Sequence, residues 1–190
     1  MRIRDIIYEN KSIQKNDLIN IIAFALSIKK EGIFTNPERE IFDNESRLIG
    51  RLIKDREKNK PLAYITKTKE FYSRPFFVDD RVLIPRPETE MLVEEALKTV
   101  RIKKRKPLIL DMGTGSGAIG LTMAIETKGT AVCVDVSEGA ICVARENARL
   151  MGLSGRVRFI CCDLFSGIRK EARFDVILAN LPYIPDTEKE

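Results

Sequence analysis

The fold of this chain is decided by the run Leu108-Ile109-Leu110-Asp111-Met112-Gly113-Thr114-Gly115-Ser116-Gly117. Its first four residues are typical of a buried strand, and the residues after Gly117 predict a helix over 118–127. Glycines between a strand and a helix let the backbone turn tightly and pass close to a ligand at the helix N-terminus. Dinucleotide-binding loops have a third glycine where this chain has Ala118, so the GxGxG pattern indicates either a loop for another ligand or a structural turn.

Strands and helices alternate along the chain from this loop onward. The strands are expected over 108–111, 130–136, 157–161 and 174–179, and the helices between them over 118–127 and 137–151. Such alternation predicts an α/β fold with a parallel, doubly wound sheet.

Acidic residues stand at the ends of three successive predicted strands, at Asp111, Asp135 and Asp163. Open α/β sheets bind ligands at this rim, where an acid accepts hydrogen bonds from ribose hydroxyls. We therefore expect Asp135 to bind a ribose, and Asp163 with the apolar Leu164 to bind an adenine edge. Taken singly, each aspartate fits a helix N-cap or a turn equally well. The set fits a nucleoside-bearing cofactor without a pyrophosphate best, and S-adenosylmethionine is the leading candidate.

The last predicted strand runs into Asn180-Leu181-Pro182-Tyr183. An asparagine side chain supplies a carbonyl acceptor, the next backbone carbonyl a second acceptor, and a tyrosine a flat face. Two acceptors suit a planar NH2 group, because they bind its hydrogens while its lone pair faces the methyl group of a sulfonium. An ordinary exit from a strand into a loop is the alternative, since these residue types are common there.

The first 60 residues differ in character from the rest of the chain. Apolar residues recur there at spacings of three and four, which predicts a small bundle of three or four helices. Asn36-Pro37 has the pattern of a helix start, with proline in the first helical position.

From Pro61 the sequence becomes aromatic and β-branched, beginning with an extended segment over 63–66. This texture predicts a β-hairpin that links two domains. We thus expect a helical domain over 1–60, a hairpin linker over 61–84 and a sheet-containing domain over 85–190.

The composition narrows the chemistry further. The 190 residues include no histidine, which excludes histidine general bases and histidine-ligated metals. The four cysteines lack CxxC spacing, so no metal site is expected. Cys133 and Cys161 stand in apolar, strand-like runs, where a free cysteine is usually a small core residue.

The chain has a net charge of +5, and residues 101–106 form a basic block. Such a block can bind nucleic acid, but it also fits the end of a helix stopped by Pro107. We favour the helix end and expect no nucleic-acid binding, because no aromatic residues are interleaved to stack on bases. No apolar run reaches the roughly 18 residues of a membrane span, and no signal peptide is evident, so a cytoplasmic protein is expected.

Three runs together resemble the HemK/PrmC family. They are residues 82–90 (VLIPRPETE), 111–117 and 180–184, and the likeness extends to 61–65 and 70–72. Members of this family are S-adenosylmethionine-dependent methyltransferases that modify the glutamine amide of the GGQ motif in peptide-chain release factors. The first run is the most family-specific, whereas the tetrapeptide from Asn180 is shared with DNA adenine methyltransferases.

The resemblance implies a Rossmann-like class I methyltransferase domain, preceded by a substrate-recruiting helical domain and a β-hairpin. It implies a protein-glutamine N5-methyltransferase with release factors as partners. The residues that it assigns to S-adenosylmethionine are Gly113, Thr114, Gly115, Ser116, Gly117, Asp135, Asp163, Leu164 and Asn180. The catalytic and substrate-binding residues that it implies are Asn180, Leu181, Pro182 and Tyr183.

The chain departs from the family pattern in three ways. Leu181 replaces a proline, which keeps the backbone carbonyl but removes the fixed φ that aims it. Lys67 replaces a glycine, which would alter the hairpin turn. The chain also ends after the fourth strand of a sheet with family order 3-2-1-4-5-7-6. We therefore expect a truncated sheet of order 3-2-1-4, with self-association through the exposed edge 174–179.

Two other functions stay open at this point. A nucleic-acid adenine N6-methyltransferase fits residues 180–183 and the basic block, although the run 85–90 favours a glutamine substrate. A non-catalytic S-adenosylmethionine-binding fragment fits the early end of the chain and Leu181.

Overall fold

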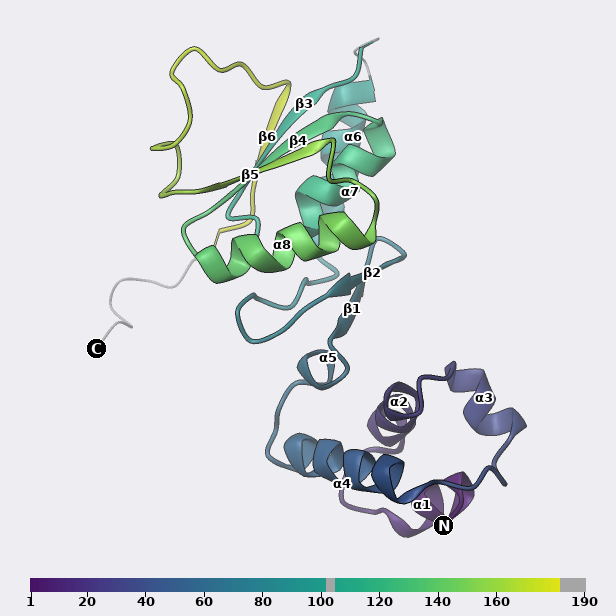
Figure 1. Cartoon of the computed structure of the whole chain (residues 1–190). Helices are drawn as coiled ribbons and strands as arrows, with labels where there is room; N and C mark the ends of the chain where they lie inside the picture. The colour runs from purple at the N-terminus through teal and green to yellow at the C-terminus, as the bar shows by residue number, and fades with distance from the viewer. Residues whose placement is uncertain (102–104, 182–190) are drawn as a thin grey trace. The chain divides into compact units, whose positions relative to one another are not determined.

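The computed structural model describes residues 1–101 and 105–181, which belong to two compact units (Figure 1). The first unit, Met1–Lys67, is helical, and the second, Thr68–Glu190, contains both sheets. Within the described ranges, no helix is long and apolar enough to cross a membrane.

Five helices make up the first unit, and α2 contacts each of the other four. Their bounds are α1 (Ile3–Glu9), α2 (Lys15–Ala25), α3 (Lys30–Thr35), α4 (Asp43–Glu57) and α5 (Leu62–Ile65). Leu18, Ile21 and Ile22 of α2 are fully buried, as their spacing of three and four residues requires. The predicted helical domain is therefore confirmed.

Residues 36–41 do not begin a helix, so the helix start predicted there is wrong. This segment runs beside the start of the chain instead. The Ile3 N–H donates to the Arg39 carbonyl (3.2 Å), and the Arg4 N–H donates to the Pro37 carbonyl (3.0 Å). These bonds satisfy N–H groups of the first turn of α1 that have no partner within the helix. The conformation of residues 36–41 therefore depends on hydrogen bonds to residues 3 and 4, which are distant in the sequence and which a local pattern cannot reveal.

Residues 62–65 form the short helix α5 rather than the predicted extended segment. Pro61 stands at its N-cap with φ −55°, close to a helical value. At the other end, the N–H and the hydroxyl of Thr66 both donate to the Leu62 carbonyl, at 2.8 and 3.0 Å. These bonds close a single helical turn before the hairpin.

The predicted hairpin is present, with β1 (Thr68–Phe71) antiparallel to β2 (Arg74–Phe77). Lys67, just before it, has φ +56°, the left-handed region that favours glycine. The lysine thus adopts a conformation typical of the glycine that the family pattern has there.

Four parallel strands form the sheet of the second unit, in the order β5-β4-β3-β6. Their bounds are β3 (Leu108–Met112), β4 (Thr130–Asp135), β5 (Val157–Cys161) and β6 (Val176–Ala179). Counted from β3, this is the predicted order 3-2-1-4. The strand order reverses between β3 and β6, which run parallel, and ligands of open α/β sheets bind in the crevice at such a switch point.

Three helices pack on one face of this sheet: α6 (Thr89–Arg101), α7 (Ala118–Thr127) and α8 (Glu138–Leu150). On the other face, Leu110 and Val132 pack against Ile168 and Phe174 from the loop after β5, which is yellow-green in Figure 1. Helices on both faces, as in a doubly wound sheet, are not seen in the part of the chain that the structure describes. The reason is that β5 is followed by a loop and not by a helix.

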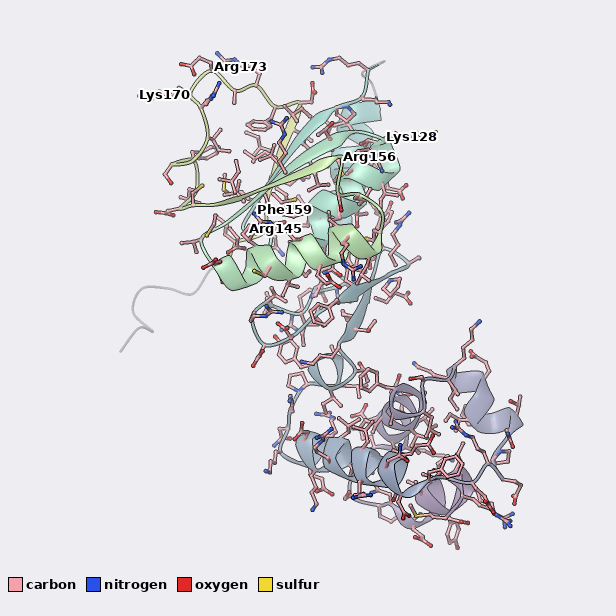
Figure 2. The ribbon with its side chains drawn as sticks, in the orientation of Figure 1. Lys128, Arg145, Arg156, Phe159, Lys170 and Arg173 are labelled. Carbon is pink, nitrogen blue, oxygen red and sulfur yellow. The ribbon has the colours of Figure 1, made fainter. Side chains whose placement is uncertain are left out.

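Two arginines form contacts near the amino ends of the strands in this sheet. Arg156, which Figure 2 labels beside Lys128, donates to the Ala124 carbonyl in α7 (3.0 Å). Arg105 pairs with Asp175 (2.6 Å) just before β6. Arg101 is the last residue of α6, which agrees with the helix-end interpretation of the basic block, and residues 102–104 of that block lie outside the described residues.

The edge strand β5 corrects one expectation about the cysteines. Cys133, in the central strand β4, is buried as expected, whereas Cys161 is exposed and not part of the core. Cys161 is the last residue of β5, where no further strand covers it among the described residues. The middle of β5 is covered by α8, since the Arg145 guanidinium lies 5.9 Å from the centre of the Phe159 ring (Figure 2).

Candidate active site

The glycine-rich run forms a loop between the carboxyl end of β3 and the first turn of α7. Gly113, Gly115 and Gly117 all have positive φ, at +69°, +54° and +83°. The Thr114 N–H donates to the Val134 carbonyl of β4 (2.9 Å), which ties the loop to the neighbouring strand. A side chain at Gly115 would meet nothing within 4 Å, so the loop backbone is open to a ligand there.

Asp111, in β3, holds this loop through hydrogen bonds. Its Oδ2 accepts hydrogen bonds from the Thr114 hydroxyl (2.5 Å) and from the Gly120 N–H (2.9 Å). The residue is fully buried, and its Oδ1 has no hydrogen-bond partner among the described residues. Desolvation raises the pKa of Asp111 to about 6, although both hydrogen bonds act in the opposite direction. Asp111 therefore shapes the loop and does not face a ligand.

Asp135 ends β4 and is held in place through both carboxylate oxygens. Its Oδ2 accepts from the Gly115 N–H and its Oδ1 from the Ser137 N–H, each at 2.9 Å. The residue is half-exposed, and each oxygen keeps a lone pair for a further donor. The N-cap of α8 is Ser137, whose hydroxyl accepts from the Ala140 N–H (3.2 Å), so Asp135 is not needed as a cap.

Asp163 and Leu164 follow β5 at the same edge of the sheet. The Cys162 N–H donates to the Asp135 carbonyl (3.0 Å), which brings this segment next to the end of β4. Both side chains are exposed, and Leu164 has φ +43°. Their predicted contact with an adenine stays a prediction.

Asn180 and Leu181 leave β6 beside the glycine loop. The Leu181 Cδ2 atom lies 2.5 Å from the position of a Cβ built on Gly113, so the two residues are in direct contact. The Asn180 Nδ2 donates to the Thr89 hydroxyl at the start of α6 (3.0 Å). Pro182 and Tyr183 lie outside the described residues.

Sequence reasoning missed Asn147, which links the hairpin to the glycine loop. Asn147 is fully buried in α8. Its Oδ1 accepts from the Phe77 N–H (2.7 Å), and its Nδ2 donates to the carbonyls of Phe77 (2.9 Å) and Ser116 (2.8 Å). The sequence signal for this role is an asparagine that lies among the apolar positions Val143, Ala144 and Ala148. A buried amide is usually hydrogen-bonded, so such a position indicates a structural contact.

Sequence reasoning also gave no individual role to Thr89 and Glu90. Thr89 contacts Asn180, and the Glu90 Oε1 accepts from the Tyr72 N–H at the tip of the hairpin (2.9 Å). Residues that are far apart in the sequence, in the hairpin, at the start of α6 and after β6, are thereby joined by hydrogen bonds.

Two families match this chain, each over one part of it. Residues 12–66 match the PrmC N-terminal domain, and residues 103–189 match a methyltransferase domain. The first match covers most of the helical unit, and the second covers the parallel sheet with its glycine loop.

Relatives with curated names are 36–39% identical to this chain over the aligned residues. A release factor glutamine methyltransferase from Leptospira interrogans is 39% identical over 171 residues, which is 89% of this chain and 60% of the relative. One from Chlorobaculum tepidum is 37% identical over 176 residues, or 88% of this chain and 60% of the relative. The chain thus spans about three fifths of the length of these relatives.

Solved structures agree with the fold. A SAM-dependent methyltransferase from Agrobacterium tumefaciens superposes with a TM-score of 0.51 and 27% identity, over 59% of this chain and 38% of that one. A human methyltransferase 10 domain containing protein has the same TM-score at 17% identity, over 60% of this chain and 56% of its own, and supports the fold alone.

The sheet order, the glycine loop and these matches define a Rossmann-like domain of the SAM-dependent methyltransferase class, preceded by a helical domain. Within that class, the chain is similar to release factor glutamine methyltransferases, and its helical unit matches the PrmC N-terminal domain. The resemblance seen in the sequence is confirmed.

Proposed function

We propose that this chain binds S-adenosylmethionine and methylates the glutamine amide of the GGQ motif in peptide-chain release factors. One observation carries the proposal, namely the hydrogen bond between Asn180 and Thr89. Asn180 begins the tetrapeptide 180–183, which resembles that of amide- and adenine-modifying methyltransferases. Thr89 belongs to the run 82–90, the most family-specific part of the resemblance. The names of the relatives support the same substrate.

The residues at the ends of β3 and β4 fit the cofactor. The open backbone at Gly115 leaves room for the methionine part along residues 113–117. Asp135 offers two lone pairs from an oriented carboxylate, which suits the paired hydroxyls of a ribose. Asp163 and Leu164 would border the adenine. When bound, S-adenosylmethionine supplies an electrophilic methyl group on a sulfonium.

Asn180 and the backbone carbonyl of Leu181 would bind the substrate amide. Each offers one acceptor to a hydrogen of the glutamine NH2 group, and together they would fix the plane of that group. An amide nitrogen is a poor nucleophile, so positioning and polarisation of its hydrogens must supply most of the rate. No histidine is needed, since the product amide loses its extra proton to water readily. Pro182 and Tyr183 belong to the same proposed slot.

The test supplies the full chain with methyl-labelled S-adenosylmethionine and two acceptors in separate reactions. One acceptor is a release factor, with a variant in which the GGQ glutamine is alanine as its control, and the other is an adenine-containing oligonucleotide. We expect label on the release factor, none on its variant and none on the oligonucleotide. Asn180→Ala should lower transfer by at least about 100-fold and weaken cofactor binding far less.

Two results would overturn the proposal. Label on the oligonucleotide would support the adenine N6-methyltransferase. Cofactor binding without transfer to either acceptor would support a non-catalytic binding protein.

A further inference from the structure

The side chain of Asn180 is held by a single hydrogen bond among the described residues. Its Nδ2 donates to the Thr89 hydroxyl at 3.0 Å, across 91 positions of sequence. Asn180 itself is exposed and stands one residue beyond β6. Without this contact, no other side-chain bond in the described part of the chain would restrain the plane of its carboxamide.

The orientation of that carboxamide decides what it offers to a substrate. With Nδ2 on Thr89, the Oδ1 is left free as an acceptor for an N–H group. The opposite orientation presents two N–H donors to the NH2 group of a glutamine, which can only donate there. In the orientation that the structure shows, the Thr89 hydroxyl accepts from Nδ2 and holds the carboxamide with its Oδ1 available to the substrate.

Thr89 is a rigid support for this contact. It is the first residue of α6, a helix anchored by the buried Val93 and Leu97. Its own N–H donates to the Arg86 carbonyl (3.0 Å), and its neighbour Glu90 is tied to the hairpin through the Tyr72 N–H (2.9 Å). The hydroxyl is thus presented by packed structure, whereas Asn180 lies on an exposed segment.

We propose that Thr89 is a positioning residue that orients the Asn180 carboxamide toward the substrate amide. The inference rests on the proposed function, because it assumes that Asn180 Oδ1 binds the glutamine NH2. It assigns a specific role to one side chain of the run 85–90, namely to hold a group on a different element without touching the substrate.

The test compares three variants of the full chain. Thr89→Val keeps the shape and removes the hydroxyl, and Thr89→Ser keeps the hydroxyl. Thr99→Val is the matched control, since Thr99 is exposed in the same helix and, among the described residues, its hydroxyl bonds only to the Glu95 carbonyl (3.2 Å). Methyl transfer to a release factor, S-adenosylmethionine affinity, thermal midpoint and the side-chain NH2 signal of Asn180 in ¹⁵N NMR spectra are measured for each.

We expect Thr89→Val to lower kcat about tenfold, as the loss of one orienting hydrogen bond predicts, with the cofactor Kd unchanged within about twofold. The Asn180 NH2 signal should shift in Thr89→Val, return toward its original position in Thr89→Ser and stay unchanged in Thr99→Val. Transfer should recover in Thr89→Ser to within about threefold of the original chain.

The inference is overturned if Thr89→Val transfers methyl groups normally, or if Thr89→Ser is as impaired as Thr89→Val. The NMR signal separates this outcome from failure of the proposed function. If the original chain methylates no release factor, the proposed function fails, and an unshifted Asn180 signal in Thr89→Val would independently refute the positioning contact.

Discussion

The carboxyl ends of β3 and β4 differ from those of β5 and β6 in how firmly they hold their polar groups. At the carboxyl ends of β3 and β4, Asp111 and Asp135 accept two hydrogen bonds each from neighbouring residues. At the ends of β5 and β6, Asp163 and Leu164 are exposed, and the Asn180 side chain has a single hydrogen bond within the described ranges. More side-chain hydrogen bonds hold the first pair of strand ends than the second, so we expect the second pair to lose more side-chain freedom when a ligand binds.

The largest expected effect is a loss of stability when Asn147 no longer supports the glycine loop at the end of β3. Asn147→Leu removes the hydrogen-bond partner of the half-buried N–H and carbonyl of Phe77 and of the buried carbonyl of Ser116. We expect the free energy of unfolding to fall by about 4 kcal/mol, since each unsatisfied buried group costs about 1–3 kcal/mol. Urea denaturation measures this change. The control Asn180→Leu, at the less ordered end, should lower it by less than about 0.5 kcal/mol.

Equal losses in the two asparagine variants would contradict the contrast between the two pairs of strand ends.

A second effect comes from the pKa of Asp111, which burial raises from 3.8 to about 6 in the folded chain. The folded state then binds the proton more tightly than the unfolded state. The chain therefore gains stability as the pH falls from 7 to 4, and loses it as the pH rises through 6. Relative to Asp111→Asn, which cannot titrate, the original chain should gain about 2 kcal/mol over this range. Urea denaturation at several pH values tests this, and a pH-independent difference between the two chains would refute it.

The smallest effect concerns backbone strain at the end of β5. Leu164 has φ +43°, a region in which a leucine costs about 1 kcal/mol relative to glycine. Leu164→Gly should raise the free energy of unfolding by about 0.5 kcal/mol and weaken S-adenosylmethionine binding about threefold, because the apolar wall is lost. Its exposed neighbour Phe165 lacks a positive φ, so Phe165→Gly should only destabilise. A less stable Leu164→Gly chain would show that the strain is absent.

Local sequence patterns predicted the elements around the glycine loop well. The helix predicted over 118–127 matches α7, and the strand over 157–161 matches β5. These elements follow from apolar periodicity and from glycines that end a strand, which act within a few residues. The same reasoning placed Asp135 at a strand end, because an acid after an apolar run marks that position.

Long-range contacts explain what the sequence left unpredicted. The conformation of residues 36–41 depends on bonds to Ile3 and Arg4, and the role of Thr89 depends on Asn180, 91 positions away. Asn147 joins two segments, at residues 77 and 116, that no local pattern connects. A single sequence carries the residue types for such contacts but not their pairing.

The most direct test of this account is a calorimetric titration of S-adenosylmethionine into the full chain, into Asp135→Ala and into Asp163→Ala. We predict one site on the original chain and no detectable binding to Asp135→Ala. Two hydrogen bonds to an oriented carboxylate are lost there, at about 1.5–3 kcal/mol each. Asp163→Ala, at the less ordered end, should bind about tenfold more weakly than the original chain. An unchanged Kd for Asp135→Ala, in a chain that still folds, would contradict the claim that the ends of β3 and β4 form the preorganised half of the cofactor site.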